Sequence, residues 1–263
     1  MSQSASRSLR TFFIVACVGL TLALPGSALC ARQAAASPAK AAPATPTADQ
    51  VLNRYLDAEG GRVAWQKLTS RVSIGKVDVP SMNLSGTVEI YEKAPDRALN
   101  IATIAGASFR QGFDGTVGWA DDPQNGLREQ MGAELAEAQR DSDFYHILNL
   151  RKLYTKFAVI DTEKIGERDA YFVEAAVPDG SEPDKMYFDT QTGLALRLIT
   201  HRHGPEGVTE FRQDFEDFRD VDGIKLPFVI HQTDGDTAYT ITISEVHHNV
   251  PIEDSQFAKP AVQ

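Results

Sequence analysis

Two histidines separated by a single residue, His201 and His203, have the most suggestive spacing for chemistry in this sequence. Alternate side chains of a strand share one face, so the two imidazoles are expected to lie about 7 Å apart. A zinc site needs further ligands at defined spacing, and the sequence contains no His-Glu-x-x-His. We therefore expect histidines at an exposed strand end and no bound metal. The remaining imidazoles that the fold could add to this pair are His231, His247 and His248.

Signals for nucleophilic, glycosidic or nucleotide chemistry are weaker still. Ser108 follows Gly106 and Ala107 but lacks the second glycine of a Gly-x-Ser-x-Gly motif. Residues 213–220 carry paired carboxylates, as a glycosidase requires, yet their alternation with phenylalanines indicates the solvated edge of a strand. We predict no catalytic residue and no cofactor. The alternative is an exported hydrolase on a β scaffold that uses His201, His203 and nearby carboxylates.

Composition excludes several other classes of function. The 263 residues include 26 Lys and Arg against 36 Asp and Glu, a formal net charge of −10. Nucleic acid is excluded as a partner, because phosphate binding depends on clustered basic side chains. Both cysteines, Cys17 and Cys30, lie in the first 30 residues. The body of the chain therefore has no thiol for a disulfide, a Cys-ligated metal or thiol catalysis.

The N-terminus resembles a secretory signal peptide. Arg7 and Arg10 precede an apolar run over residues 12–24, which is short for a transmembrane helix. Small residues then lead to Ala28, which suits cleavage by a signal peptidase. We assign residues 1–30 to the signal and expect the protein in the periplasm.

The segment after the signal has the composition of a linker. Residues 31–47 are rich in Ala and Pro and contain almost no apolar bulk to bury. A lipoprotein signal would place a small residue directly before the acceptor cysteine, but Leu29 precedes Cys30. This favours a soluble cleaved product over a lipid anchor at Cys30. A single folded domain is expected over residues 48–263.

Hydrophobic periodicity predicts a mainly β (α+β) fold. Thr47 is a suitable N-cap for an amphipathic helix that Gly60 and Gly61 end. From residue 72 onward the period changes from 3.6 to 2, which is typical of strands with one dry face. A helical insertion interrupts the strands from Gly132 to about Leu153. About eleven antiparallel strands are expected in all, and such a sheet must curl and be covered by helices. The strands after the first two are expected at 97–105, 107–113, 154–164, 168–177, 184–189, 194–203, 207–220, 224–233 and 237–247.

Three short segments resemble a known bacterial family. They read GFDGTVGW at 112–119, YFDTQTGL at 187–194 and VDGIKLPF at 221–228. With the first helix, their order and spacing resemble the outer-membrane lipoprotein-sorting protein family over residues 48–260. The resemblance implies an unclosed β-barrel of about eleven strands whose helices cover an apolar concave face. It also implies a monomeric, non-enzymatic carrier of lipoprotein acyl chains or lipid, with an inner- or outer-membrane delivery partner.

Strand parity and the aromatic cluster near residue 115 suggest which side chains line an apolar cavity. Side chains on alternate positions of a strand share a face, and large aromatic rings supply apolar area. A protein-interaction domain that senses envelope stress would show the same pattern and remains an alternative. The expected ligand-binding residues are Leu84, Val88, Ile90, Phe109, Phe113, Trp119, Leu194, Leu196, Leu198 and Phe228.

The signal assignment predicts the cellular location of a truncated chain. Deleting residues 2–30 removes both basic residues and the apolar run, so the protein should remain in the cytoplasm. Cell fractionation followed by immunoblotting measures this directly. Recovery of the truncated protein in the periplasmic fraction would show that the assignment is wrong.

Overall fold

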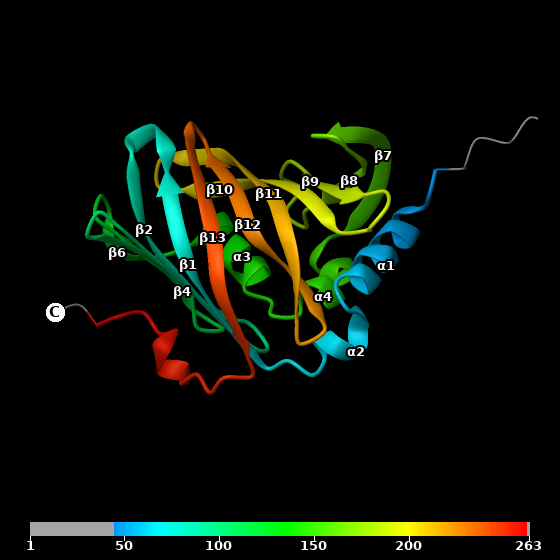
Figure 1. Cartoon of the computed structure of the whole chain (residues 1–263). Helices are drawn as coiled ribbons and strands as arrows, with labels where there is room; N and C mark the ends of the chain where they lie inside the picture. The colour runs from blue at the N-terminus through cyan, green and yellow to red at the C-terminus, as the bar shows by residue number, and fades with distance from the viewer. Residues whose placement is uncertain (1–44, 262–263) are drawn as a thin grey trace, which may run out of the picture. The chain divides into compact units, whose positions relative to one another are not determined.

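The computed structural model describes residues 45–261, which form one open antiparallel sheet with helices against it (Figure 1). All thirteen strands pair in the order β6-β5-β4-β3-β2-β1-β13-β12-β11-β10-β9-β8-β7, so β6 and β7 are the two edges. The mainly β, unclosed architecture expected from the sequence is confirmed. The strands are β1 (Ser70–Val79), β2 (Leu84–Lys93), β3 (Arg97–Ile104), β4 (Ala107–Phe113), β5 (Gly118–Asp122), β6 (Gly126–Glu129), β7 (Lys156–Ile165), β8 (Arg168–Ala176), β9 (Asp184–Asp189), β10 (Ala195–Gly204), β11 (Gly207–Val221), β12 (Ile224–Asp234) and β13 (Thr237–His248).

The strand count exceeds the expected eleven by two. The additional strands are β5 and β6, which follow β4 as a short meander at the edge of the sheet. They are five and four residues long, and glycines at Gly112, Gly115 and Gly118 make this region resemble turns in the sequence. Short edge strands of this kind limit the unpaired backbone that a sheet presents to other chains.

Four α-helices accompany the sheet: α1 (Ala48–Ala58), α2 (Gly61–Trp65), α3 (Gly132–Asp141) and α4 (His146–Leu153). The predicted N-cap is confirmed, because Thr47 and Gln50 form a reciprocal capping box at the start of α1. The predicted insertion is present as two helices joined by residues 142–145. No helix within residues 45–261 is long and apolar enough to span a membrane. The proposed signal and most of the proposed linker lie outside the described residues.

The concave face of the sheet holds two hydrophobic clusters beneath the helices. In the first, strands β1, β2, β12 and β13 pack against Trp65 of α2, Phe144 of the α3–α4 link and Ile147 of α4. In the second, α1 and α4 pack against β8 and β9 through side chains such as Leu52 and Val173. The helices therefore act as a cover over apolar sheet, as the amphipathic pattern predicted.

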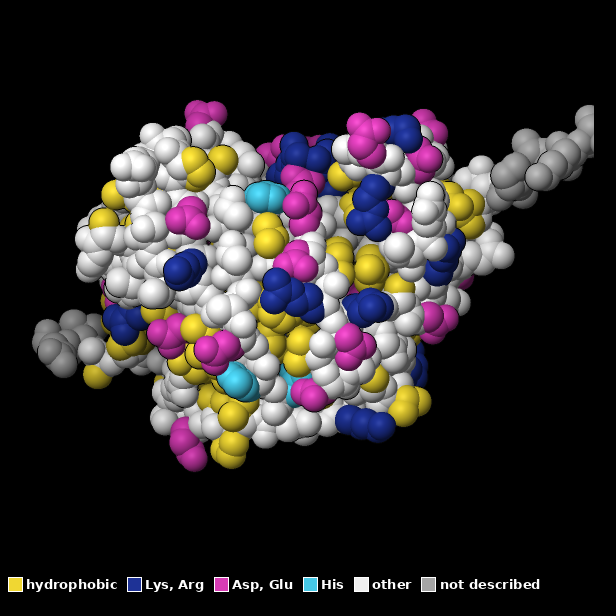
Figure 2. Space-filling view, in the orientation of Figure 1, with side chains coloured by type: hydrophobic (Ala, Val, Ile, Leu, Met, Phe, Trp, Pro, Cys, Tyr) yellow, Lys and Arg dark blue, Asp and Glu magenta, His cyan; other side chains and the backbone are white. Residues whose placement is uncertain are grey.

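The opposite, convex face of β1–β5 is covered by the C-terminal segment. Phe257 and Ile252 pack there on Leu99 and Trp119, and the Trp119 indole nitrogen donates a 2.8 Å hydrogen bond to the carbonyl oxygen of Phe257. On the face shown in Figure 2, acidic and basic side chains are interspersed rather than gathered by sign.

A bulge in β10 changes the expected alternation of its leucines. The pairing of β10 with β9 shifts register between Ala195 and Arg197, so the residues before and after the bulge do not follow one parity. Leu196 packs with Phe172 and Tyr187, whereas Leu198 packs with the α1–α4 cluster on the opposite face. The expectation that these leucines share one face is therefore wrong.

The junction between α1 and α2 approaches the β11–β12 turn closely. Gly60 has a φ of 117°, and a Cβ atom there would collide with the carbonyl oxygen of Gly223. The amide of Lys225 donates to the Glu59 carbonyl oxygen at 3.2 Å. The close contact requires glycine and fixes Glu59 against the sheet.

Two alanine substitutions separate backbone strain from this close contact. Gly61 also has a left-handed φ of 77°, but a Cβ there meets nothing within 4 Å. Gly61→Ala should cost only the strain of a left-handed L residue, roughly 1 kcal/mol. Gly60→Ala adds a backbone collision and should cost about 3 kcal/mol or more. Urea unfolding of both variants measures the difference, and equal losses would contradict the contact.

Candidate functional site

The structure places four of the ten predicted ligand-binding residues in the helix-covered clusters. Val88 and Phe228 are buried in the first cluster, and Ile90 packs against it. Leu198 packs against the second cluster. These side chains form part of the floor beneath the helices, and none of them lines either of the cavities described below.

The other six predicted residues are dispersed. Trp119 lies in the convex cluster and Leu196 packs on the face of β8–β10 opposite the helices. Leu84 is 36% exposed at the start of β2. None of these six lines a cavity, so contact with a ligand stays a prediction for all ten. The remaining three are Phe109, half-buried, and Phe113 and Leu194, both buried.

The paired histidines of β10 contact different carboxylates. The Nδ1 atom of His203 lies against the Glu137 carboxylate of α3, whose other oxygen accepts the His203 backbone amide at 3.0 Å. The Nε2 atom of His201 lies 3.3 Å from Glu182. Within residues 45–261 no three His, Cys, Asp or Glu side chains come together as a metal site. These pairs tie α3 and the segment before β9 to β10.

The carboxylate run of residues 213–220 lies in β11, which pairs with strands on both sides. Glu216 and Asp217 are exposed, as expected of a solvated stretch. The strand itself, β11, is interior to the sheet, so the solvated side chains lie on one of its faces rather than at an edge of the sheet. Asp217 has a left-handed φ of 52°, which interrupts the alternation, and Phe215 and Phe218 both line a cavity.

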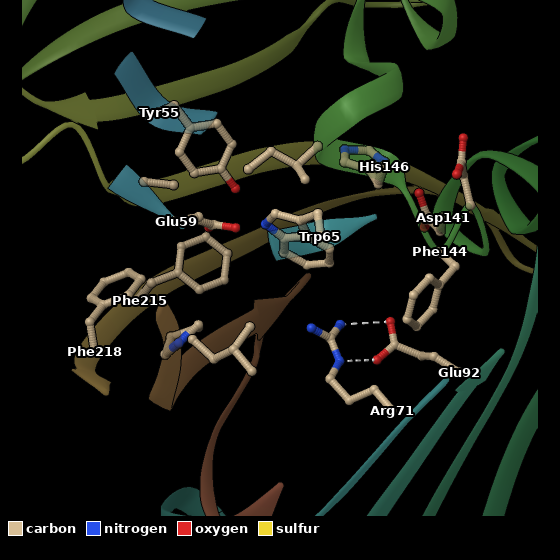
Figure 3. Close-up of a pocket in the computed structure, with 15 residues that line it drawn as sticks. Tyr55, Glu59, Trp65, Arg71, Glu92, Asp141, Phe144, His146, Phe215 and Phe218 are labelled. Atoms are coloured by element: carbon tan, nitrogen blue, oxygen red, sulfur yellow. Dashed lines mark hydrogen bonds and ion pairs between the residues drawn. The ribbon is translucent and has the colours of Figure 1, made fainter. Parts of the chain in front are cut away.

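That cavity lies under the helical cover and has a volume of about 220 Å³ (Figure 3). Its walls come from α1, α2, α4, the α3–α4 link and strands β1, β2, β10, β11 and β12, so distant parts of the sequence meet there. The lining mixes aromatic and aliphatic side chains with ionisable groups, which distinguishes it from ordinary core. The residues that line it are Tyr55, Glu59, Trp65, Arg71, Glu92, Asp141, Asp143, Phe144, His146, Ile147, Ala195, Phe215, Phe218, Leu226 and Pro227.

Glu59 is the buried acid of this cavity. It is the C-cap of α1 and only 7% exposed, and it lies one helical turn after Tyr55, whose hydroxyl points toward it (Figure 3). Burial raises the pKa of Glu59 from 4.5 to about 7, against smaller lowering effects of the Tyr55 hydroxyl and the Arg71 charge. Glu59 is therefore close to half protonated at neutral pH.

Arg71 and Glu92 form an ion pair across β1 and β2 at the lower wall of the cavity. The two residues are register partners, and Arg71 donates from Nε at 2.6 Å and from Nη2 at 2.8 Å to the two Glu92 oxygens. This bidentate arrangement is the strongest geometry for such a pair. It neutralises both charges at a place where water is largely excluded.

Two further nitrogen-bearing rings face this space. The Nε1 atom of Trp65 is buried and has no hydrogen-bond partner in the described part of the chain. His146 begins α4, and burial lowers its pKa in spite of the nearby Asp141 and Asp143 carboxylates. The imidazole is therefore neutral at pH 7, and it contributes no positive charge to the lining.

Sequence reasoning missed the polar part of this cavity, although one signal was available. Tyr55 and Glu59 are four residues apart on α1, so both lie on the helical face that also carries Val51 and Leu52. An acid on an apolar stripe, directly before Gly60, is an anomaly that predicts a buried carboxyl. The pairing of Arg71 with Glu92 depended on strand register, which the sequence does not specify.

A second cavity, of about 290 Å³, lies beside α3 and α4 near residues 177–179. Arg140 and Lys152 line it together with the apolar Leu153 and Val177. Arg140 also lies 4.0 Å from the buried Asp184, which accepts a 2.7 Å hydrogen bond from Tyr154. One of the two basic side chains, Arg140, is therefore engaged with the first residue of β9.

Comparison with solved structures identifies the fold. The chain is similar to a LolA superfamily protein from Nitrosomonas europaea, at 14% identity and a TM-score of 0.52 over 82% of this chain and 99% of that one. It is also similar to a DUF1329 family protein from Desulfovibrio piger, at 14% identity and a TM-score of 0.52, over 81% of this chain and 98% of that one. A third similar structure is a putative outer membrane lipoprotein-sorting protein domain from Vibrio parahaemolyticus. Its identity is 12% and its TM-score 0.50, over 80% of this chain and 95% of that domain. No protein-family model and no curated protein sequence matches the chain. The chain thus has a LolA-like fold.

The buried Glu59 predicts a specific pH dependence of stability. Its pKa in the folded state is above its ordinary value of 4.5, so as pH rises the unfolded chain releases the proton before the folded protein does. This stabilises the unfolded state relative to the folded state. The resulting penalty on the folded state grows between about pH 5 and 8 and is constant above that. Glu59→Gln removes the titration, so the stability of the variant relative to wild type should rise by about 2 kcal/mol across this range. Urea unfolding at several pH values measures it, and a constant difference would contradict the raised pKa.

Proposed function

We propose that this protein is a periplasmic, non-enzymatic carrier or binder of a lipidated ligand, either lipoprotein acyl chains or lipid. The observation that carries the proposal is the apolar concave face of an open sheet, which helices cover without filling completely. The LolA-like fold supports it, since two of the similar structures are a LolA superfamily protein and a lipoprotein-sorting domain.

Apolar burial alone supplies enough energy for such a function. Each methylene removed from water contributes about 0.8 kcal/mol, so an acyl chain of about a dozen carbons contributes on the order of 10 kcal/mol. Part of this offsets the loss of ligand freedom on binding. No bond needs to be made or broken in the cargo, and binding and release are the whole task.

Loading requires the helical cover to move. A volume of about 220 Å³ is below the roughly 300–1,000 Å³ typical of ligand pockets, so a long chain needs more room than this arrangement of the helices provides. The insertion α3–α4 is the segment that would move. Its polar ties to the rest of the domain are made mostly by side chains: Glu137 to His203, Tyr154 to Asp184, and a bidentate pair between Glu134 and Arg128 of β6. These contacts can break without unfolding a strand.

The proposed location and partners follow from the same reading. Export by the N-terminal signal would bring the protein to the periplasm, where acylated cargo needs cover from water between membranes. A carrier must also release its cargo, so a delivery partner at the inner or outer membrane is part of the proposal. We propose that the carrier is a monomer with the concave face enclosed by its own helices.

Two neighbouring residues of β10 provide a matched test. Ala195 lines the cavity, whereas Leu196 packs on the opposite face of the sheet. Ala195→Phe should fill the cavity and reduce retained lipid severalfold in native mass spectrometry of protein prepared by mild extraction. Leu196→Trp should cost roughly 1–3 kcal/mol by overpacking and leave retained lipid unchanged.

The wild-type measurement decides the proposal as a whole. Lipid should copurify with the wild-type protein and be exchangeable for an added acylated compound. Absence of both retained lipid and binding to a fluorescent acyl probe would overturn the carrier function. Equal lipid retention by the Ala195→Phe and Leu196→Trp variants would show that the cargo lies elsewhere.

A further inference from the structure

The indole nitrogen of Trp65 is a hydrogen-bond donor without a partner in a place where water is largely excluded. The Trp65 side chain is 5% exposed, and Nε1 makes no hydrogen bond to any of residues 45–261. Figure 3 shows this nitrogen directed into the cavity, on the side of Glu59 and Tyr55. A buried donor left unpaired is costly to a folded protein, and this one is available to an acceptor that enters the cavity.

The second tryptophan shows what this protein does with an indole that serves only structure. Trp119 is buried to a similar extent at 2% exposed, and its Nε1 donates to the Phe257 carbonyl oxygen at 2.8 Å. The contrast is between one indole whose donor is satisfied within the convex core and another whose donor faces a cavity.

The charges around Trp65 define what kind of acceptor fits. One basic side chain, Arg71, faces the cavity, and it is already paired with Glu92. The other ionisable groups of the lining are Glu59, Asp141, Asp143 and the neutral His146. Carboxyl groups thus outnumber the basic group, and a phosphate or carboxylate of the ligand would meet repulsion with no free cation to offset it.

We propose that the cavity binds an uncharged carbonyl of an acylated ligand, of the ester or amide type, through a hydrogen bond from the Trp65 indole N–H. This rests on the proposed function and specifies which part of the cargo the cavity takes. A hydroxyl beside that carbonyl, as in an acylated glycerol, can donate to Glu59 or Tyr55 across the cavity. The apolar walls formed by Phe215, Phe218 and the helical cover then enclose the first carbons of the chain.

The size of the cavity agrees with the proposal that it holds the carbonyl and the first carbons of the ligand but not the whole acyl chain. A volume of about 220 Å³ lies below the range of roughly 300–1,000 Å³ that is typical of pockets for whole ligands. This accommodates a carbonyl junction with a few attached carbons but not a whole acyl chain. The polar junction is therefore bound in the preformed part of the site, while the rest of the chain depends on movement of α3–α4.

A pair of uncharged lipids that differ in the carbonyl tests the proposal. Monolauroylglycerol has an ester carbonyl, whereas dodecylglycerol has a methylene group in its place, with the same number of chain carbons and the same hydroxyls. Binding of each to the delipidated, exported protein is measured by calorimetry or by displacement of a fluorescent acyl probe. Wild type should bind the ester about tenfold more tightly than the ether, the effect of one well-formed hydrogen bond.

Trp65→Phe is the deciding variant, because it keeps an aromatic ring and removes the N–H. It should lower affinity for the ester about tenfold and leave the ether unchanged, so the preference disappears. Tyr145→Phe is the matched control. It also removes a polar hydrogen near the first cluster, but the Tyr145 hydroxyl donates to the Leu68 carbonyl oxygen at 2.9 Å rather than lining the cavity. The ester preference should survive in this control.

The outcomes distinguish this inference from the function on which it rests. Equal wild-type affinity for ester and ether, or a Trp65→Phe loss that is the same for both, would overturn the carbonyl site while leaving the carrier function intact. Tighter binding of laurate than of monolauroylglycerol would overturn the requirement for an uncharged group. Failure to bind any of these compounds while the acyl probe still binds would overturn this inference alone. Absence of probe binding and of retained lipid would overturn the carrier function as well. Circular dichroism of Trp65→Phe should match wild type, and its thermal melting should show only the loss expected when a buried ring becomes smaller, since Trp65 also packs in the first cluster.

Discussion

The constraint on which this structure depends is that the concave face of an unclosed sheet must be kept from water. Strands β1, β2, β12 and β13 present a continuous apolar surface there, and the sheet does not close on itself to hide it. Helices on the cover side meet this surface at only some positions, because helical and strand side chains repeat with different periods. Where the two surfaces fail to interdigitate, a cavity remains between α1, α2, the α3–α4 link and β11.

Polar groups under this cover are held by geometry that offsets their desolvation. A buried ion pair often contributes little net stability, but removal of one partner is strongly destabilising. Arg71 and Glu92 face each other across two strands in bidentate contact, so each keeps the other from being an isolated buried charge. Glu59 has no such partner in the lining and is relieved by protonation instead. The two solutions leave one wall with a fixed ion pair and the other with an acid that can donate or accept.

The sequence was sufficient for the parts of the fold that rest on local patterns. Thr47 and the apolar stripe of α1 predicted the first helix, and period-two alternation predicted all strands except β5 and β6. Those two were missed because they are short and lie beside closely spaced glycines. The bulge at Ala195–Arg197 and the left-handed Asp217 were missed for another reason: each reverses parity through backbone geometry that no side-chain pattern encodes.

The cavity was harder to predict than the fold because alternation assigns residues to a face but does not say what covers them. All ten expected ligand contacts were chosen from strands and from the turns beside them, yet the polar groups of the cavity come largely from the cover: Tyr55 and Glu59 from α1, Trp65 from α2 and His146 from α4. The strands supply a general apolar floor that any protein with this fold needs for stability. The chemical character of the cavity therefore depends largely on the helices and their links, which supply most of its polar groups. Similar structures at 12–14% identity accordingly share the fold with few residues in common.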